Sequence, residues 1–361
     1  MVNRRDRINR TRLPKNPNPQ HFSVKEQEKL ERLFHRNATL SPSQIEKYYT
    51  CGFQYFCRYG LDLKARQKAE LSPMHRGNVI HYLLDILLKE YDIIHLSEAD
   101  LEKLVDRYLL EYLNQVMGGA QEKPQKFLYF YRRLGKTLKR IFSSLKEEFS
   151  QTAFQVVGLE EPIRADSSIC PLHISVDESH AITVIGKVDR VDLYSFEEEN
   201  FVRIVDYKSG SKEFDLNGMA AGLHLQMLLY LFAIWRTQNE KYKNVTPAGI
   251  LYMPAGNPKP ILDREASEDA EQDAVQKSFS MNGLLLNSQT VLCAMEKNLE
   301  GKFIPVSRGK SGLKGKYLAS RAEFAALEKY TMELVQQMGE SLFSGNVRPD
   351  PIQATVNPPC N

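Results

Sequence analysis

Apolar positions recur with helical spacing through most of the first half of the chain. Ser41 precedes Pro42, and Gln44 completes the Ser-x-x-Gln pattern of a capping box, so we expect a helix from Pro42 towards Cys57. A short charged helix before it and three longer amphipathic helices after it are expected over 23–34, 73–90, 97–117 and 124–151. The first half is therefore predicted to be mainly helical.

The periodicity changes after residue 151. Short runs rich in Val, Ile and aromatic residues predict strands over 154–159, 182–193, 201–207 and 249–253. Further helices are expected over 218–235 and 321–342. This order predicts a mixed α/β core, a central sheet flanked by helices, with a helical annex on its N-terminal side.

Composition divides the chain into a lead-in and one domain. Residues 1–38 form a basic, partly irregular lead-in, and 39–361 form the domain. Within it we expect a helical part, a catalytic α/β core, and an insertion followed by a C-terminal helical part, over 39–151, 152–255 and 256–361. Pro258, Pro260 and a run of acidic residues mark 255–275 as an exposed insertion.

Charge and hydropathy exclude some classes of protein. With 42% hydrophobic residues among 361, the chain can bury a substantial core, and it lacks the 18 consecutive apolar residues of a membrane span. Its basic N-terminus lacks a signal peptide's apolar stretch, so we expect a cytoplasmic protein without a membrane partner. The net charge of +3 is small, but basic residues gather in 1–15 and 302–321. Each tract could follow a phosphate backbone or be a solvated charge run.

Two aspartates near the ends of apolar strand patterns carry the strongest chemical signal. If the hairpin loop 195–200 turns between residues 197 and 198, Asp189 and Asp206 fall opposite each other on neighbouring strands. Two carboxylates this close favour a hard divalent cation between them, Mg²⁺ or Mn²⁺. Lys208 projects from the same strand face as Asp206, where its ammonium could orient water or stabilise charge on a phosphate. The alternative is a structural salt bridge of the aspartates with Arg190 or Lys208.

A second Asp-x-Lys sequence, Asp62-Leu63-Lys64, has no partner carboxylate on a paired strand, and we interpret it as solvated surface. His81 lies in an apolar helical pattern, where a lone histidine is more often a core residue than a ligand. Gln226 and Tyr230 are one helical turn apart, so their polar ends could point at the site, or their spacing could be ordinary amphipathic packing.

Five segments in order resemble one family. They are 40–53 (LSPSQIEKYYTCGF), Gly77-x-x-x-His81, Gly186-x-x-Asp189-Arg190-x-Asp192, Asp206-Tyr207-Lys208-Ser209 and Gln226-x-x-x-Tyr230. From residue 39 to Cys360 the chain resembles the nuclease domain of the B subunit of AddAB-type ATP-dependent helicase/deoxyribonucleases. These belong to the RecB-like branch of the PD-(D/E)XK nuclease superfamily, which has a restriction-endonuclease-like core.

The resemblance implies a ligand set and a catalytic set of residues. His81, Asp189, Asp206 and the Tyr207 carbonyl would bind the metal, and Lys208 would assist catalysis, with Gln226 and Tyr230 beside it. We further expect Gly77 to let the helix of His81 approach the sheet closely.

The resemblance also implies an iron–sulfur cluster whose ligand set is incomplete in this chain. Relatives hold a [4Fe–4S] cluster by one cysteine before the nuclease core and three near the C-terminus. Cys51 matches the first ligand and Cys360 the second, whereas the other cysteines do not fall at ligand positions. We expect an excised domain or a gene fragment without a stoichiometric cluster.

The sequence therefore leads to a metal-dependent DNA nuclease. We expect it to cut single strands, as an exonuclease, during double-strand break repair and recombination in complex with an ATP-driven helicase–nuclease A subunit. One alternative is a free-standing RecB-like exonuclease of the kind associated with CRISPR adaptation. Another is a catalytically silent scaffold that binds DNA ends.

Overall fold

The fold is built on a six-stranded mixed sheet. The computed structural model describes residues 27–64, 73–121, 123–210, 214–256, 277–310 and 312–347. In spatial order the sheet contains β11 (Leu318–Ala319), β8 (Asn282–Leu286), β7 (Val245–Pro254), β6 (Glu199–Lys208), β5 (Gly186–Phe196) and β2 (Gln155–Ile163). The β6–β7 and β8–β11 pairs are parallel and the others antiparallel. This confirms the predicted mixed sheet.

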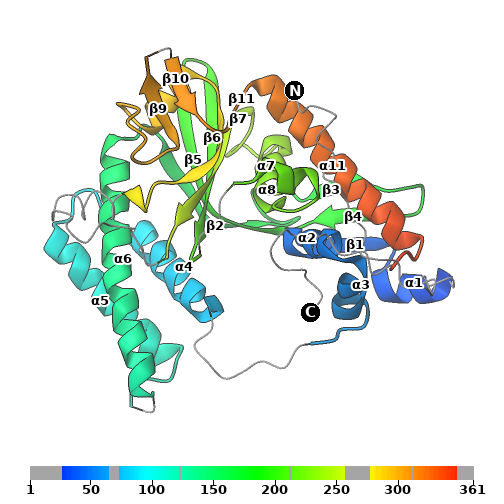
Figure 1. The fold of residues 1–361 in the computed structure, drawn as a ribbon, viewed down its shortest axis with the longest axis horizontal. Helices are drawn as coiled ribbons and strands as arrows, with labels where there is room; N and C mark the ends of the chain where they lie inside the picture. The colour runs from blue at the N-terminus through cyan, green and yellow to red at the C-terminus, as the bar shows by residue number, and fades with distance from the viewer. Residues whose placement is uncertain are drawn as a thin grey trace.

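Helices lie on both sides of this sheet (Figure 1). On one side is the long helix α6 (Gln125–Gln151), and on the other are α7 (Leu216–Ala220), α8 (Gln226–Arg236) and α11 (Arg321–Phe343). The short helix α10 (Gln289–Met295) contacts β8. Strands buried on both faces need apolar residues throughout, and β6 is buried from Phe201 to Tyr207.

Two smaller sheets complete the strand structure. In one, β1 (Asn37–Leu40) pairs with β4 (Ala181–Val184), which also pairs with β3 (Leu172–Ser175). The other is a hairpin of β9 (Val306–Gly309) and β10 (Gly312–Gly315). Because β4 directly precedes β5 in the chain, the pairing of β1 with β4 joins the N-terminal elements to the central sheet.

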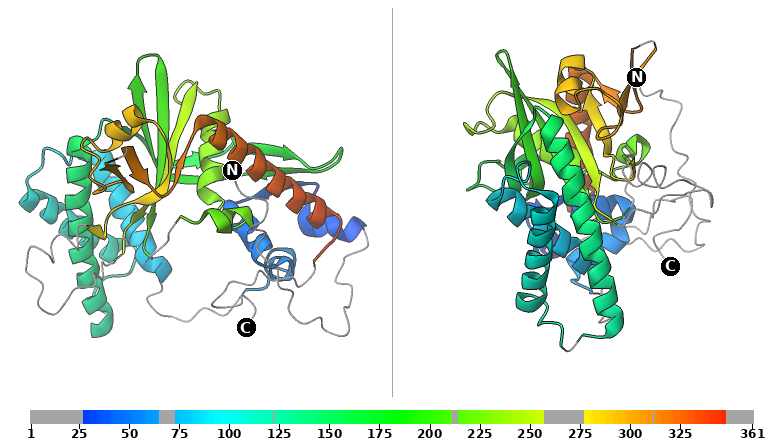
Figure 2. Two further views of the ribbon diagram at one scale, coloured as in Figure 1. Left: turned by 45° about the horizontal axis from the view of Figure 1, so that its top comes forward. Right: turned by 90° about the vertical axis from the view of Figure 1, so that its left-hand side faces the viewer.

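The N-terminal half is helical, as predicted. Its elements are α1 (Gln27–Phe34), α2 (Pro42–Thr50), α3 (Gly52–Tyr55), a π-helical turn (Phe56–Gly60), α4 (Pro73–Glu90) and α5 (Glu98–Gln115). The Ser41 capping box is present, with Gln44 bonded back to the Ser41 amide. Figure 2 shows α5 and α6 running side by side and projecting away from the sheet. No helix among the described residues is long and apolar enough to cross a membrane.

Three predicted elements are each divided in two. The helix expected from Pro42 towards Cys57 ends at Thr50, because Cys51 is extended, with φ −168° and ψ 116°. The strand expected over 182–193 is interrupted at Ile185, whose amide bonds to the Leu40 carbonyl of β1 as the chain passes between sheets. The helix expected over 218–235 is broken at Gly222, which has φ 84° and packs under the Tyr49 ring.

Other differences concern short elements and the hairpin. Strands β1, β3, β8, β9, β10 and β11 and helix α10 were not predicted. All of these strands except β8 have four residues or fewer, too few to show a clear alternation of apolar and polar positions. The hairpin loop is shorter than predicted, since β5 extends to Phe196 and β6 begins at Glu199. The basic tract 1–15 and almost all of the predicted insertion 255–275 lie outside the described residues.

A neutral cluster of four buried charges joins α6 to the central hairpin. Arg190 lies 2.7 Å from the Asp192 carboxylate and 2.9 Å from that of Glu148, and Arg203 lies 2.8 Å and 2.6 Å from the same two groups. All four side chains are almost fully inaccessible. Arg190 and Asp192 alternate with Asp189 along β5, so the cluster occupies the opposite face of the sheet from Asp189.

We predict that Glu148→Gln lowers the free energy of unfolding by about 3–5 kcal/mol, because it leaves buried guanidinium charge uncompensated. Urea denaturation at neutral pH measures the change.

The stability of the cluster also depends on pH. Burial raises the pKa of Asp192, but Arg190 and Arg203 outweigh burial and hold that pKa below its ordinary value. The stabilisation is therefore present above the ordinary pKa of an aspartate and is lost as pH falls through the lowered one.

Glu199→Gln is the matched control. Glu199 makes a two-oxygen contact with Arg321 like those in the cluster, but both side chains are exposed and solvent screens them. Equal destabilisation by the two substitutions would show that burial of the Glu148 cluster has no special effect.

Candidate active site

The register of the central hairpin brings two aspartates together. β5 and β6 pair in sequence from Phe196 opposite Glu199 to Arg190 opposite Val205. One residue further along both strands, Asp189 and Asp206 are opposite each other. The turn between residues 197 and 198 therefore gives the predicted register, which is confirmed.

A third carboxylate, Glu160, extends this row onto β2. The pairs Leu159–Arg190 and Glu161–Val188 flank it, so Glu160 falls opposite Asp189. Glu160 was not among the predicted site residues, because the predicted strand ended at residue 159 whereas β2 continues to Ile163. Its φ of 51° is in the left-handed region, an unusual backbone conformation for glutamate within a strand. The sequence contained one signal for this residue, because the acidic pair Glu160-Glu161 lies within a segment that stays extended up to Ile163.

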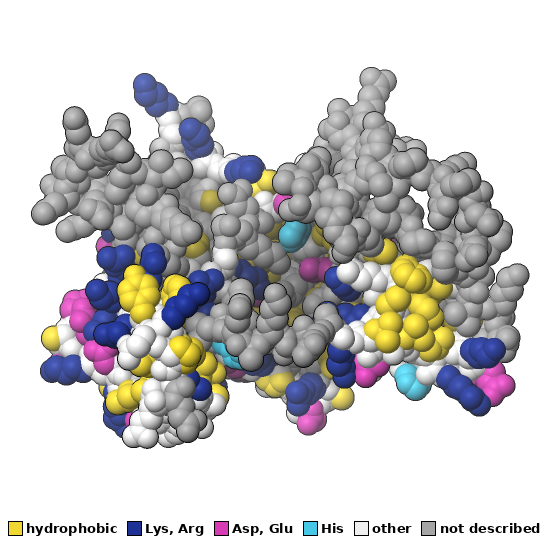
Figure 3. Space-filling view, turned by 60° about the horizontal axis from the view of Figure 1, so that its bottom comes forward, with side chains coloured by type: hydrophobic (Ala, Val, Ile, Leu, Met, Phe, Trp, Pro, Cys, Tyr) yellow, Lys and Arg dark blue, Asp and Glu magenta, His cyan; other side chains and the backbone are white. Residues whose placement is uncertain are grey.

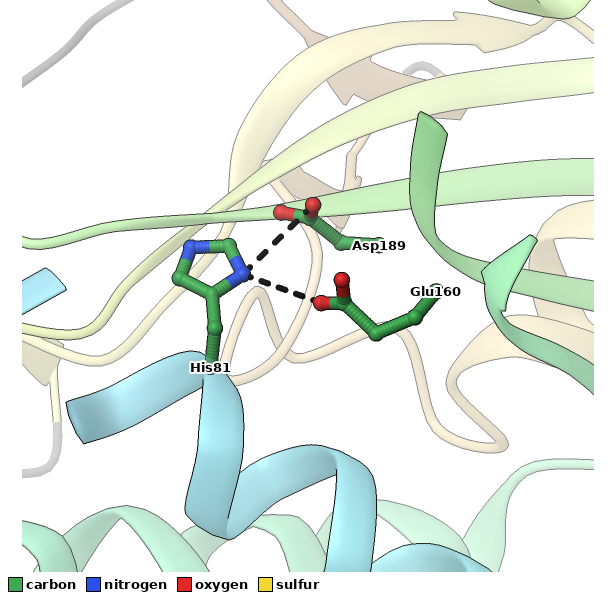
Figure 4. Close-up of side chains that lie close together, drawn as sticks. All are labelled: His81, Glu160 and Asp189. Atoms are coloured by element: carbon green, nitrogen blue, oxygen red, sulfur yellow. Dashed lines mark hydrogen bonds and ion pairs between the residues drawn. The ribbon is translucent and has the colours of Figure 1, made fainter. Parts of the chain in front are cut away.

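His81 reaches this row from α4 (Figure 4). Its Nδ1 lies 3.2 Å from Glu160 Oε1 and 3.5 Å from Asp189 Oδ1. Helix α4 packs on β2 through its apolar face, with Val79, Ile80 and Leu83 buried, while His81 stays half-buried. The structure thus places the imidazole against the carboxylates and not in the apolar core.

The three groups form a compact set of ligand atoms. One nitrogen of His81 and one oxygen each of Glu160 and Asp189 lie within 4.8 Å of one another. Among the described residues, Asp206 is not part of this set, although its negative charge acts on both His81 and Asp189.

The electrostatics of the cluster follow from burial and crowding. Burial, and next the negative charge of Asp206, raise the pKa of Asp189 to about 7. Burial lowers the pKa of His81, but its hydrogen bond to Glu160 and the nearby carboxylates outweigh burial, so the pKa of His81 is above its ordinary value. Burial raises the pKa of Glu160, but bonds from His81 and Lys187 outweigh it and the net shift is downward. A divalent cation would relieve the same repulsion.

Asp206 is held by groups on its own strand and on α8. Lys208 Nζ lies 2.6 Å from Asp206 Oδ2, and Gln226 Nε2 donates to Asp206 Oδ1 at 3.3 Å. The structural salt bridge that we considered as the alternative to a metal site is therefore present between Asp206 and Lys208. Arg190 makes its ion pairs with Asp192 and Glu148 and not with Asp189.

Gln226 and Tyr230 are both close to the site. Gln226 is the first residue of α8, and its backbone amide donates to the Glu46 carboxylate at 3.0 Å, which fixes the start of the helix. Tyr230, one turn later, packs on Gly186, where an added Cβ would lie 2.4 Å from the ring. Burial raises the pKa of Tyr230, so its hydroxyl remains protonated. Gly186 thus makes room for the tyrosine.

The Tyr207 carbonyl is the remaining predicted ligand, and its role stays a prediction. The Tyr207 amide nitrogen donates to Asp189 Oδ2 at 3.0 Å, which fixes the orientation of that carboxylate.

Other predicted features lie apart from this cluster. Gly77 does not bring α4 closer to the sheet, because an added Cβ would have no atom within 4 Å, so that expectation is wrong. Cys51 is buried between α2 and α3, and Cys360 lies outside the described residues. The side chains of Asp62 and Lys64 are 77% and 80% exposed, as expected of solvated surface.

Comparison with known proteins agrees with this arrangement. A model of the PD-(D/E)XK nuclease superfamily matches residues 39–361. The chain belongs to this superfamily. This member of the nuclease superfamily is also similar to proteins named as the B subunit of an ATP-dependent helicase/deoxyribonuclease. It is 29% identical to those of Thermoanaerobacter sp. (strain X514) and Clostridium acetobutylicum, over 92% and 93% of its length.

A third relative, from Caldanaerobacter subterraneus subsp. tengcongensis, is 30% identical over 88% of the chain. The chain spans only about 30% of the length of these relatives.

The donor set fits a divalent metal ion, of the kind PD-(D/E)XK nucleases use. Two carboxylate oxygens and an imidazole nitrogen suit Mn²⁺ and, with more oxygen ligands, Mg²⁺. We predict that Glu160→Gln and His81→Ala each weaken Mn²⁺ binding by about tenfold or more, since even residues that only support ligands change affinity that much. Calorimetric titration of the folded proteins measures it.

Glu161→Gln is the matched control for Glu160. Glu161 is the next residue, its carboxylate pairs with Lys241, and it is not part of the set of ligand atoms found among the described residues. The Glu161→Gln substitution should leave Mn²⁺ affinity unchanged. For His81→Ala a lowered melting temperature with unchanged Mn²⁺ affinity would contradict the ligand assignment and make His81 a packing residue.

Proposed function

We propose that this chain is a Mg²⁺- or Mn²⁺-dependent deoxyribonuclease that hydrolyses phosphodiester bonds and acts on single strands as an exonuclease. The observation that carries the proposal is the cluster of His81, Glu160 and Asp189 next to Asp206 and Lys208. Acidic groups alone are common on protein surfaces. This site combines a half-buried imidazole with three carboxylates in register and a lysine beside them. These groups are sufficient for metal-assisted hydrolysis.

His81, Glu160 and Asp189 would hold the metal, with Asp206 and the Tyr207 carbonyl as further ligands. A divalent ion held there would supply Lewis-acid activation of the phosphodiester and of water. The amide of Tyr207 orients Asp189 through the bond to Oδ2. Asp206 is oriented from its other oxygen by Gln226. The protein therefore presents carboxylate oxygens in fixed directions before any ligand arrives.

Lys208 is the cation placed to meet the reacting phosphate. Its side chain is 25% exposed, and its ammonium contacts the Asp206 carboxylate, which is 4% exposed. An ammonium there can position water for attack or stabilise the charge that develops on the phosphate oxygens. Tyr230, with its raised pKa, is a hydrogen-bond donor beside the cluster and cannot serve as a base near neutral pH.

The biological setting is proposed from the relatives' names. A protein named as the B subunit of a helicase/deoxyribonuclease implies, for that protein, a second subunit and a DNA substrate. We infer that this chain acts in double-strand break repair and recombination beside an ATP-driven A subunit, in the cytoplasm. The similarity over 92% of the chain favours this setting over a free-standing exonuclease.

We predict that Asp189→Ala, Asp206→Ala and Lys208→Ala each reduce Mg²⁺-dependent cleavage of single-stranded DNA by about a thousandfold or more. The expected loss follows from removing groups that act on charge in the transition state. End-labelled oligonucleotides resolved on denaturing gels measure the rate and show whether cleavage proceeds from an end. Circular dichroism melts verify the fold.

The double substitution Asp62→Ala/Lys64→Ala is the matched control, since it removes the other Asp-x-Lys pair, which is exposed. It should cleave as the unsubstituted chain does. If a correctly folded Asp206→Ala variant retained full cleavage, the activity would belong to another site.

A further inference from the structure

Helix α6 carries a long stretch of positive charge with no acidic residue of its own in that stretch. Between Lys126 and Lys146 its sequence contains seven Lys or Arg residues and no Asp or Glu. Lys139 bonds to Glu102 and Asp106 on α5, and Lys146 pairs with Glu98. The other five form no ion pair with any described residue; they are Lys126, Arg132, Arg133, Lys136 and Arg140.

Four of these cations form one stripe. Arg132, Arg133, Lys136 and Arg140 recur at helical spacing and are exposed, whereas the residues between them pack inward. Like charges three and four positions apart destabilise a helix. A bound polyanion would relieve that repulsion along the whole stripe.

Aromatic side chains continue the stripe at its N-terminal end. Tyr129 shares the face of the cations and is 57% exposed, and its neighbour Phe130 is 42% exposed. The two rings meet edge to face, with centroids 5.7 Å apart. Figure 3 shows Lys and Arg side chains gathered around apolar ones at the left-hand end of the molecule, where α5 and α6 lie. A positively charged surface next to exposed aromatic rings is the combination with which proteins bind single-stranded nucleic acid.

A groove runs beside the stripe between α5 and α6. It has a volume of about 600 Å³ and an apolar floor that includes Leu109, Leu113 and Tyr131. Its polar lining consists of Arg132, Lys136 and the ion pair of Asp106 with Lys139. A base has an apolar face and lies next to its phosphate, so a floor and lining of this kind match one nucleotide at a time.

We propose that this face of α6, defined by Tyr129, Arg132, Arg133, Lys136 and Arg140, is a binding surface for single-stranded DNA. The proposal rests on the proposed nuclease function for the choice of DNA. The stripe spans about 16 Å, which is several nucleotides of a strand. Cations would hold the phosphates, and Tyr129 would stack on a base.

The surface is separate from the metal cluster. Helix α4, which carries His81, packs on α5, and α5 packs on α6. Glu148 of α6 contacts Arg190 on the opposite face of the sheet from Asp189, and the stripe ends eight residues before Glu148, about 12 Å along the helix. Long strands can therefore contact both places, whereas a small phosphodiester can occupy only the catalytic cluster.

The test is the triple variant Arg133→Gln/Lys136→Gln/Arg140→Gln. Its affinity for a fluorescent oligothymidylate of about 30 nucleotides is measured by anisotropy in EDTA over a series of KCl concentrations. We expect about tenfold weaker binding and a salt slope reduced by about two, since each phosphate contact on a single strand contributes about 0.7. The matched control carries Lys243→Gln, Lys297→Gln and Lys329→Gln, which remove the same charge from other exposed positions and should bind as the unsubstituted chain.

Tyr129→Ala separates stacking from charge. It should weaken binding of the single strand about tenfold and leave affinity for duplex DNA unchanged, because stacked duplex bases are not accessible to the ring. Equal loss for both substrates would remove stacking from the proposal.

Hydrolysis of bis(p-nitrophenyl) phosphate reports on the catalytic cluster alone. The triple variant should hydrolyse it with unchanged kcat and KM while KM for long DNA rises. If the unsubstituted chain hydrolyses neither substrate but the stripe still governs DNA affinity, the nuclease proposal fails and this one stands. If the triple variant keeps full affinity and the original salt slope, the proposal is overturned, and a protein partner becomes the occupant that fits the groove.

Discussion

The pairing register of β5 and β6 is the constraint on which the rest of the site depends. A two-residue turn fixes it, and a slip of one residue would send Asp189 or Asp206 to the opposite face. In this register, Glu160 of β2 lies in the same row of carboxylates, and His81 of α4 contacts Glu160. Three strands and one helix thus converge on a few ångströms of one sheet face.

Crowding carboxylates has an electrostatic cost, which the structure offsets locally. The pKa of Asp189 rises to about 7 through burial and the charge of Asp206, while Lys187, Lys208 and His81 supply positive or hydrogen-bonding partners. On the reverse face the Glu148 cluster is neutral and fully buried. The same two strands therefore carry a charge-balanced anchor on one side and an excess of acid on the other. Such an excess is what a cation site requires.

Much of the fold and part of the site could be predicted from the sequence because the signals were local. The turn position gave the Asp189–Asp206 register, and helical periodicity gave the bounds of α4 as found. Glu160 could not be found in this way, because its place depends on how far β2 pairs with β5 and on an unusual φ of 51°. The Glu148 cluster was likewise missed, since it joins positions 55 residues apart in sequence. The role suggested for Gly77 failed because an added Cβ there would meet no atom within 4 Å, so the packing of α4 does not require a glycine at that position.

The central claim is that the carboxylate row and His81 form one metal centre. Anomalous diffraction from crystals soaked in Mn²⁺ and recorded at the manganese edge tests it most directly, because it locates the ion without reference to activity. The account predicts a peak in contact with His81, Glu160 and Asp189, within the cluster whose ligand atoms lie within 4.8 Å of one another. A well-occupied manganese elsewhere, with none at this cluster, would contradict it.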